Sequence, residues 1–265
     1  MLGSLRLASL LLLTGCSLAF PLDGYDEGTG ASAAGGAGGT QTTNSTNSSG
    51  PSGGAGGTGG GPGVCGSGLY PPASTFTDSF DENETPQFLG CGVQTGGELV
   101  FDMPTTPPHF CASEAPYPLC LVNSAFTVKV PQAATVQIPG VQTTIHFVAA
   151  DSSGEMLLLL EGNGFALFGT AGGQDFDIPI PNGSYDPFAA AWWRLEGVDG
   201  QLSFQTSSNG TDWVERVRAD VPLSLDGLTV ELGANRYYND AFPQSADLPA
   251  TSAHFDCVNL AGNCP

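Results

Sequence analysis

Carboxylates and imidazoles are the side chains best able to do acid–base chemistry, and their spacing in this chain forms no familiar constellation. Asp175 and Asp177 share one face of an alternating segment, but no third acid joins them, and a solvated edge is the expected role. Glu231 has no acidic residue two or four positions away. The chain contains three histidines in unrelated segments: His109, His146 and His254. A lone strand histidine such as His146 is expected to be simply packed or solvated.

Two common hydrolase signatures are missing from the chain. It contains neither the Gly-x-Ser-x-Gly nucleophile elbow nor the His-Glu-x-x-His zinc motif. An acid pair assembled from different strands stays open as an alternative, because sequence spacing does not report cross-strand neighbours. The chain is therefore expected not to be an enzyme, and the alternative is a glycan-cleaving hydrolase or lyase with an unorthodox acid pair.

The side chains that could bind a ligand are aromatic. Alternation in the Trp192-Trp193 pair puts one ring inward and the other outward, and if Trp193 faces in with Leu195, Trp192 points out. Arg236, Tyr237 and Tyr238 follow a predicted strand and form a candidate rim loop. The alternative is a tryptophan that covers a sheet edge and a tyrosine loop packed on itself. Trp213 closes a turn and is expected in the core.

The N-terminus resembles the export signal of bacterial lipoproteins. Arg6 precedes a run of Leu and Ala that is too short to span a bilayer, and Leu13-Thr14-Gly15-Cys16 resembles a lipobox. The resemblance implies cleavage after residue 15, with Cys16 carrying a diacylglyceryl group and palmitate-class acyl chains on the bacterial cell envelope. Ser17, by the family's sorting rule, implies the outer membrane. The alternative is an ordinary signal peptide with a chance cysteine.

The charge balance is strongly acidic, with 26 acidic against six basic residues and a net charge of −20. Loss of the signal peptide would remove Arg6 as well. The remaining basic residues are Lys129, Arg194, Arg216, Arg218 and Arg236. So few cations exclude binding to nucleic acid, and the excess of carboxylates favours solubility outside the cell.

Six cysteines remain once Cys16 is assigned to lipid: Cys65, Cys91, Cys111, Cys120, Cys257 and Cys264. An even number in an exported chain predicts three disulfides out of 15 possible connectivities. Short loops favour pairing Cys111 with Cys120 and Cys257 with Cys264, which leaves Cys65 for Cys91. A zinc site is the alternative, but no Cys-x-x-Cys spacing supports it.

Composition divides the chain into three parts: the signal peptide (1–15), a lipid-anchored linker (16–64) and one domain (65–265). The linker is rich in Gly, Ser and Thr, and is expected to be disordered because it has too little apolar surface to bury. The domain reads as short strands separated by turn signals, which predicts an all-β sandwich. The predicted strands are 143–149, 155–160, 165–168, 192–196, 202–206, 213–217 and 228–232. Asp199-Gly200 predicts a type I′ hairpin turn between two of them.

The segment Trp193–Trp213 resembles the central hairpin of concanavalin A-like lectin/glucanase domains, with an Arg-bearing strand, an Asp-Gly turn and a Ser-x-x-Gly-x-x-Trp loop. Segments 76–80 and 97–101 resemble the family's opening strands, and 253–257 its closing strand. The resemblance implies a two-sheet antiparallel jelly-roll sandwich over residues 74–258.

This resemblance also carries expectations about sites. Glucanases of the fold place Glu-x-Asp-x-x-Glu on one strand, and the chain has no such run. Asp78, Asp81 and Asp256 lie on the first and last strands, where related folds sometimes hold a structural calcium ion. The function expected is a non-catalytic, surface-anchored domain that binds a glycan or another envelope partner, or merely contributes to the envelope.

Overall fold

The computed structural model describes residues 65, 69–81, 84–105, 109–134, 140–181, 185–236, 250–260 and 264. Cys16, the predicted signal peptide and the predicted linker lie outside these residues. The described residues all belong to one compact unit, residues 57–265. None of the helices in this described part has the length and apolar character needed to cross a membrane.

Strands make up nearly all of the described secondary structure. In chain order the elements are η1 (Ala73–Thr75), β1 (Leu89–Gly90), β2 (Val93–Thr95), β3 (Glu98–Met103), β4 (His109–Glu114), β5 (Leu119–Cys120), β6 (Ala125–Gln132), β7 (Val141–Ala149), β8 (Gly154–Glu161), β9 (Gly164–Ala171), β10 (Gln174–Ile178), β11 (Trp192–Val198), β12 (Gln201–Ser207), β13 (Val214–Ala219), β14 (Asp226–Arg236) and β15 (Thr251–Asp256).

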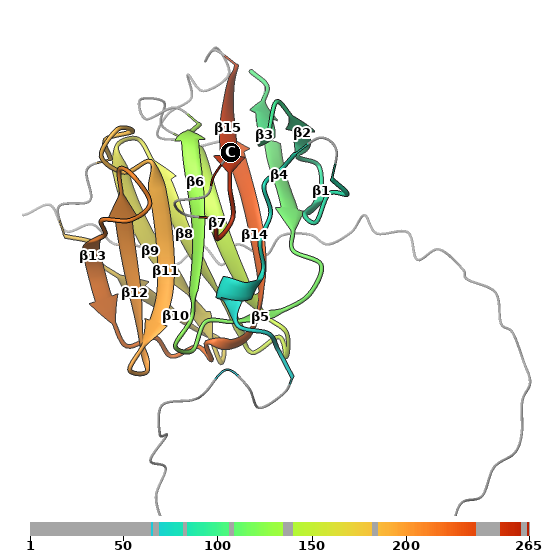
Figure 1. The fold of residues 1–265 in the computed structure, drawn as a ribbon. Coiled ribbons are helices and arrows are strands. Elements are labelled where there is room, and N and C mark those ends of the chain that lie inside the picture. The colour runs from blue at the N-terminus through green and yellow to red at the C-terminus, as the bar shows by residue number, and fades with distance from the viewer. Residues whose placement is uncertain are drawn as a thin grey trace, which may run out of the picture. The chain divides into compact units, whose positions relative to one another are not determined.

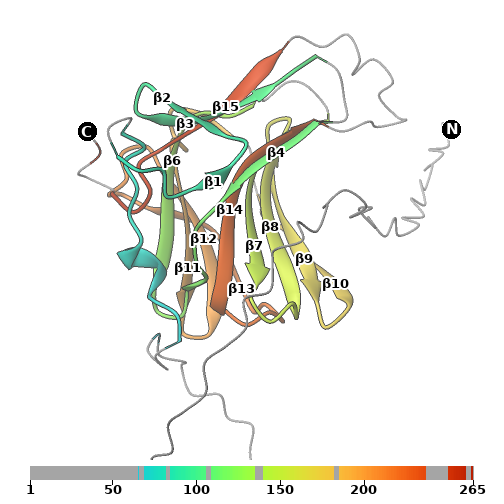
Figure 2. The same cartoon turned by 90° about the vertical axis from the view of Figure 1, so that its right-hand side faces the viewer.

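Two antiparallel sheets stack face to face in a sandwich (Figures 1 and 2). The eight-stranded sheet has the order β1-β4-β14-β7-β8-β9-β10, and β5 also pairs with β14. The seven-stranded sheet has the order β13-β12-β11-β6-β15-β3-β2. Figure 2 looks between the layers, with β6, β11 and β12 on one side and β7, β8 and β9 on the other. The predicted all-β, two-sheet antiparallel sandwich is confirmed.

The core fills the space between the sheets because inward side chains alternate with outward ones along each strand. In β11, Trp193 and Leu195 are fully buried, and Phe204 of β12 lies opposite Leu195. The ring of Phe165 in β9 meets Trp193 and Phe204 edge-on, with centroid distances of 5.1 and 5.0 Å. Aromatic side chains from opposite sheets thus join the two layers.

The hairpin between β11 and β12 forms at the predicted dipeptide. Asp199 and Gly200 both have positive φ, 53° and 81°. A type I′ turn requires positive φ at both central residues, and its twist matches that of the flanking strands. The turn sets the register of the hairpin, in which seven residues of β11 pair with seven of β12 and Leu195 lies opposite Phe204.

Most of the predicted strands are confirmed, although the observed strands extend beyond several of them. The exception is the expected opening strand at 76–80, where the structure contains only the isolated bridge between Asp78 and Val258. Phe80 has a positive φ of 52°, and this left-handed residue ends any extended run. The predicted strands did not include β1, β2, β4, β5, β6 or β10.

The disulfides differ from the pairing expected from short loops. The Cys257–Cys264 bond is confirmed. The other two predicted pairs are wrong, because the structure joins Cys65 to Cys120 and Cys91 to Cys111. Cys111 lies in β4, and β1, which pairs with β4, ends just before Cys91. Cys120 lies beside the chain at Pro71 and Pro72, a few residues after Cys65. The pairing of the strands, and not the length of the loops, therefore determines which cysteines form disulfides.

Candidate functional site

One row of outward side chains crosses seven strands of the eight-stranded sheet, all but β5, with each residue directly opposite the next. We call this the central row: Leu89, Glu114, Glu231, His146, Leu157, Phe168 and Asp177. Its members come from β1, β4, β14, β7, β8, β9 and β10 in that order. Because the side-chain period of a strand is two, a register fixed by the buried face also fixes which residues form this row.

His146 is the centre of the row and bridges three strands. Its Nδ1 lies 2.9 Å from Oε2 of Glu231 in β14, and its Nε2 lies 3.1 Å from Oε2 of Glu155 in β8. Both partners are carboxylates, so the doubly protonated imidazolium donates from both ring nitrogens. Burial alone would lower the pKa of His146, but the two carboxylates outweigh it and raise the pKa from 6.5 to about 9.

The contact with His146 also changes the pKa of Glu155. Its hydrogen bond with the His146 imidazole holds the pKa of this carboxyl below its ordinary value. Near neutral pH the protonated His146 therefore lies between two carboxyl groups at hydrogen-bonding distance. The ion pair fixes the orientation of all three side chains on the outer face.

Phe168 is the exposed aromatic residue of the row. Its side chain retains 36% exposure, and its cross-strand neighbours on the same face are Leu157 and Asp177. Asp175 projects from β10 on the same side as Asp177, since Phe176 between them packs against the core. An aromatic ring beside carboxylates on a sheet face can stack on the apolar face of a sugar while the acids accept its hydroxyl groups.

Glu114 and Glu231 are a cross-strand acid pair. They are directly opposite in β4 and β14. Directly opposite residues of antiparallel strands have Cβ atoms about 4.5–5.5 Å apart. The alternative of an acid pair built from different strands thus has one pair of residues that fits it, although Glu231 is also held by His146.

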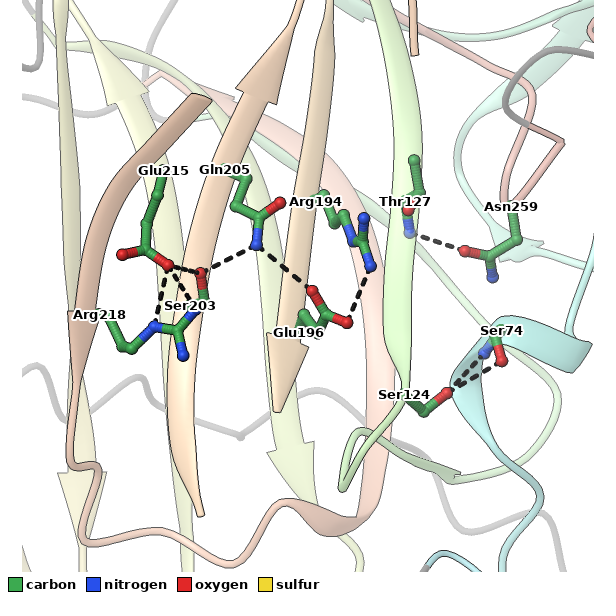
Figure 3. A network of polar contacts seen from close by, with 10 residues as sticks. All are labelled: Ser74, Ser124, Thr127, Arg194, Glu196, Ser203, Gln205, Glu215, Arg218 and Asn259. Atoms are coloured by element: carbon green, nitrogen blue, oxygen red, sulfur yellow. Dashed lines mark hydrogen bonds and ion pairs between the residues drawn. The ribbon is translucent and has the colours of Figure 1, made fainter. Parts of the chain in front are cut away.

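The outer face of the seven-stranded sheet is occupied by contacts among its own polar side chains (Figure 3). The Arg218 guanidinium donates to Glu215, which accepts from Ser203. Next to them, Gln205 bonds to both Ser203 and Glu196, and Glu196 pairs with Arg194 at 2.8 Å. This network binds β11, β12 and β13 together.

Trp213 lies on this face, where the Arg194 guanidinium carbon sits 5.4 Å from its ring centroid. Its side chain is half-buried and makes a cation–π contact, so the expectation that it belongs to the core is wrong. Trp213 directly precedes the edge strand β13, on the side of the sheet that the second sheet does not cover.

No family model and no curated protein matches the chain. Solved structures do match. An endo-acting O-glycanase from the human gut microbiota that initiates mucin breakdown is 12% identical, with a TM-score of 0.53 over 69% of this chain and 96% of that one. A native glycosidic hydrolase is 9% identical, with a TM-score of 0.51 over 69% of this chain and 93% of its own.

A third match is an immunostimulatory antigen and pseudo β-1,3-glucanase of Mycobacterium tuberculosis, 12% identical with a TM-score of 0.51 over 69% of this chain and 96% of that one. The described domain therefore has a jelly-roll fold of the concanavalin A-like type. At these identities the likeness shows the fold alone, and the fold is shared by two glycan-cleaving proteins and a pseudo-glucanase. Its three disulfides indicate an extracytoplasmic location.

The jelly roll does not present the predicted aromatic cluster. Trp192 is outside the core cluster that contains Trp193, as predicted, but only 5% of it is exposed. It offers no open ring to a ligand. The prediction that Arg236 belongs to a rim loop is wrong. Arg236 is the last residue of β14, it is 1% exposed, and its Nη1 donates a hydrogen bond to the Thr105 carbonyl. Tyr237 and Tyr238 lie outside the described residues.

The predicted calcium ligands do not come together. Among the described residues, only Asp256, Cys257 and Cys264 have three potential ligand atoms close enough for a metal. That group does not suit an ion either, because the cysteines form a disulfide and Asp256 pairs with Lys129 at 2.7 Å. Asp78 is buried and accepts a hydrogen bond from the Phe80 amide, and burial raises the pKa of its carboxyl.

His146 and Phe168 are the site residues that sequence reasoning missed. The histidine gained its partners from β8 and β14, which lie 9 and 85 residues away in the chain. Phe168 sits in a short apolar run in which every residue reads as core. Alternation with the buried Phe165 and Leu167 was the available signal that it faces out.

Proposed function

We propose that this protein is a lipid-anchored protein of the bacterial outer membrane whose jelly-roll domain binds a glycan on the outer face of the eight-stranded sheet without cleaving it. The exposed ring of Phe168 carries the proposal. It stands in the central row between the carboxylate of Asp177 and the apolar Leu157. The row from Asp177 to Glu114 crosses six strands, about 24 Å at the usual strand spacing, and an oligosaccharide could lie along it.

Binding to a polysaccharide panel tests the proposal. We expect the purified mature protein to retain at least one glycan, and Phe168→Ala to weaken that binding about tenfold, since loss of one stacked ring is worth about 1–2 kcal/mol. Phe188→Ala is the matched control, because Phe188 is 87% exposed on a turn and belongs to no strand of the eight-stranded sheet. If the protein retains no glycan, carbohydrate binding is excluded. If both variants lose the same amount of glycan affinity, the central row is not the binding site.

The anchor rests on the lipobox resemblance at Cys16 and has its own test. We expect the unaltered precursor to incorporate labelled palmitate and to sediment with outer membranes. A Cys16→Ala precursor should lose the label and leave the membrane fraction. Membrane association that survives this substitution would contradict the lipid anchor.

Glycan cleavage is the second candidate function, and the opposed carboxyls of Glu114 and Glu231 favour it. A retaining glycosidase needs two carboxyl groups roughly 5–5.5 Å apart, which the Cβ spacing of a directly opposite pair allows. Release of reducing ends from any bound glycan, abolished by Glu231→Gln and by Glu114→Gln, would establish it. Full binding with no new reducing ends would exclude it and support the non-catalytic proposal.

A further inference from the structure

The two outer faces of the sandwich differ in charge. Every Lys and Arg among the described residues lies either on the seven-stranded sheet or in the core. Lys129 is in β6, Arg194 in β11, and both Arg216 and Arg218 in β13, whereas Arg236 is buried at the end of β14. Within the described part of the chain, His146 is the cation that faces out from the middle of the eight-stranded sheet.

The carboxylates on the outer face of the eight-stranded sheet differ in their partners, and Glu114 at the β4 end of the central row is exposed opposite Glu231. Glu155 and Glu231 are compensated by His146. Asp175 and Asp177 are different: both are exposed on the edge strand β10, and no ion pair within the described residues involves them. Asp177 lies directly opposite Phe168, and Asp175 lies two residues away along β10 on the same face, so negative charge without an ion pair lies beside the exposed ring.

We infer that the central row takes a glycan that carries free amino groups, such as an oligosaccharide of glucosamine. The inference rests on the proposed glycan-binding function. An ammonium group beside a pyranose stacked on Phe168 can donate charge-assisted hydrogen bonds to Asp177 and Asp175, which are about twice as strong as neutral ones. The same carboxylates repel sulfated and uronic acid-bearing glycans, because none of the described Lys and Arg residues faces out from this sheet.

A matched pair of ligands tests the inference. Calorimetric titration of the full mature protein in detergent would compare a chitosan hexamer with the fully N-acetylated chitin hexamer, which has the same backbone without the charges. We expect the amine form to bind at least tenfold more tightly at low salt. This preference should shrink in 0.5 M NaCl, because exposed charge pairs are screened.

Variants separate charge from stacking. Asp177→Asn should remove most of the preference for the amine form, because the amide oxygen can still accept a hydrogen bond from a sugar hydroxyl but no longer carries the charge that the ammonium group needs; the affinity for the acetylated form should fall much less. Phe168→Ala should lower the affinity for both hexamers by the same factor. Asp102→Asn is the control for charge, since Asp102 is an exposed acid on the outer face of the seven-stranded sheet, and it should change neither.

The outcomes distinguish the two claims. Equal binding of both hexamers, or tighter binding of a sulfated glycan, would overturn the amine inference and leave the proposed glycan binding intact. A preference for the amine form that Asp177→Asn does not alter would also overturn it. If the protein binds neither hexamer and no member of a wider panel of neutral and anionic glycans, the proposed function itself is overturned.

Discussion

At the scale of single residues, His146 shows how a titratable side chain can act as a structural tie. Its two hydrogen bonds connect β7 to both neighbouring strands on the outer face, where no core packing helps. An ion pair with half-exposed partners is usually worth little. Here one imidazolium serves two carboxylates, and its own side chain is largely buried, which strengthens both contacts.

The His146 tie predicts a specific pH dependence of stability. The pKa of His146 is raised to about 9 in the folded chain from 6.5, so its contribution is fully present below pH 6.5 and is lost as pH rises through 9. We expect His146→Gln to lower the free energy of unfolding by about 2 kcal/mol at pH 6 after screening is considered. Urea denaturation should show this difference vanishing by pH 10. A difference that stays constant from pH 6 to pH 10 would contradict the charged tie.

The tryptophans predict unequal stability effects. Trp193 is fully buried, contacts Phe165 edge-on and donates from Nε1 to the Ala190 carbonyl at 3.0 Å. Trp193→Ala should therefore cost about 3–5 kcal/mol. Trp213→Ala should cost less than half as much, because the ring is half-buried and its main partner is Arg194. Denaturant midpoints of the two variants would check the order, and equal losses would contradict it.

At the scale of elements, strand positions could be predicted from local pattern, whereas pairing could not. Alternation and turn dipeptides predicted β11 and β12 with their hairpin, because a two-residue turn sets the register of both strands. The pairing of β14 with β4 and β7 brings together residues that are at least 79 positions apart in the chain, as for Leu228 and Ala149. For that reason the central row, including the Glu114–Glu231 pair, was invisible in the sequence.

The hairpin turn predicts a glycine-specific cost. Gly200 has φ of 81°, a conformation that a Cβ disfavours by about 1–2 kcal/mol. Gly200→Ala should lower the free energy of unfolding by that amount. Gly164→Ala is the control, because a Cβ there would meet no atom within 4 Å and its φ is not left-handed. Thermal unfolding of both variants measures the effect, and an equal loss at Gly164 would show that the turn geometry is not the cause.

At the scale of the whole molecule, the disulfides connect segments that the sheets bring together. Cys91–Cys111 joins the chain at the end of β1 to β4, and Cys257–Cys264 closes a short loop after β15. Cys65–Cys120 ties the start of the described domain to β5, which pairs with β14 in the eight-stranded sheet. The predicted short-loop scheme failed because loop length affects the unfolded chain, while the folded sheets decide which thiols meet.

The observed pairing predicts a ranking of stabilities. The loops span 55, 20 and 7 residues, for which chain entropy gives about 4, 3 and 2 kcal/mol. Replacing Cys65 and Cys120 together by alanine should therefore destabilise the protein most, and the Cys257/Cys264 double variant least. Equilibrium denaturation of the three double-alanine variants in oxidising buffer measures the order. Non-reducing peptide mapping of the unaltered protein checks the pairs directly, and recovery of a Cys111–Cys120 peptide would refute both the connectivity and the ranking.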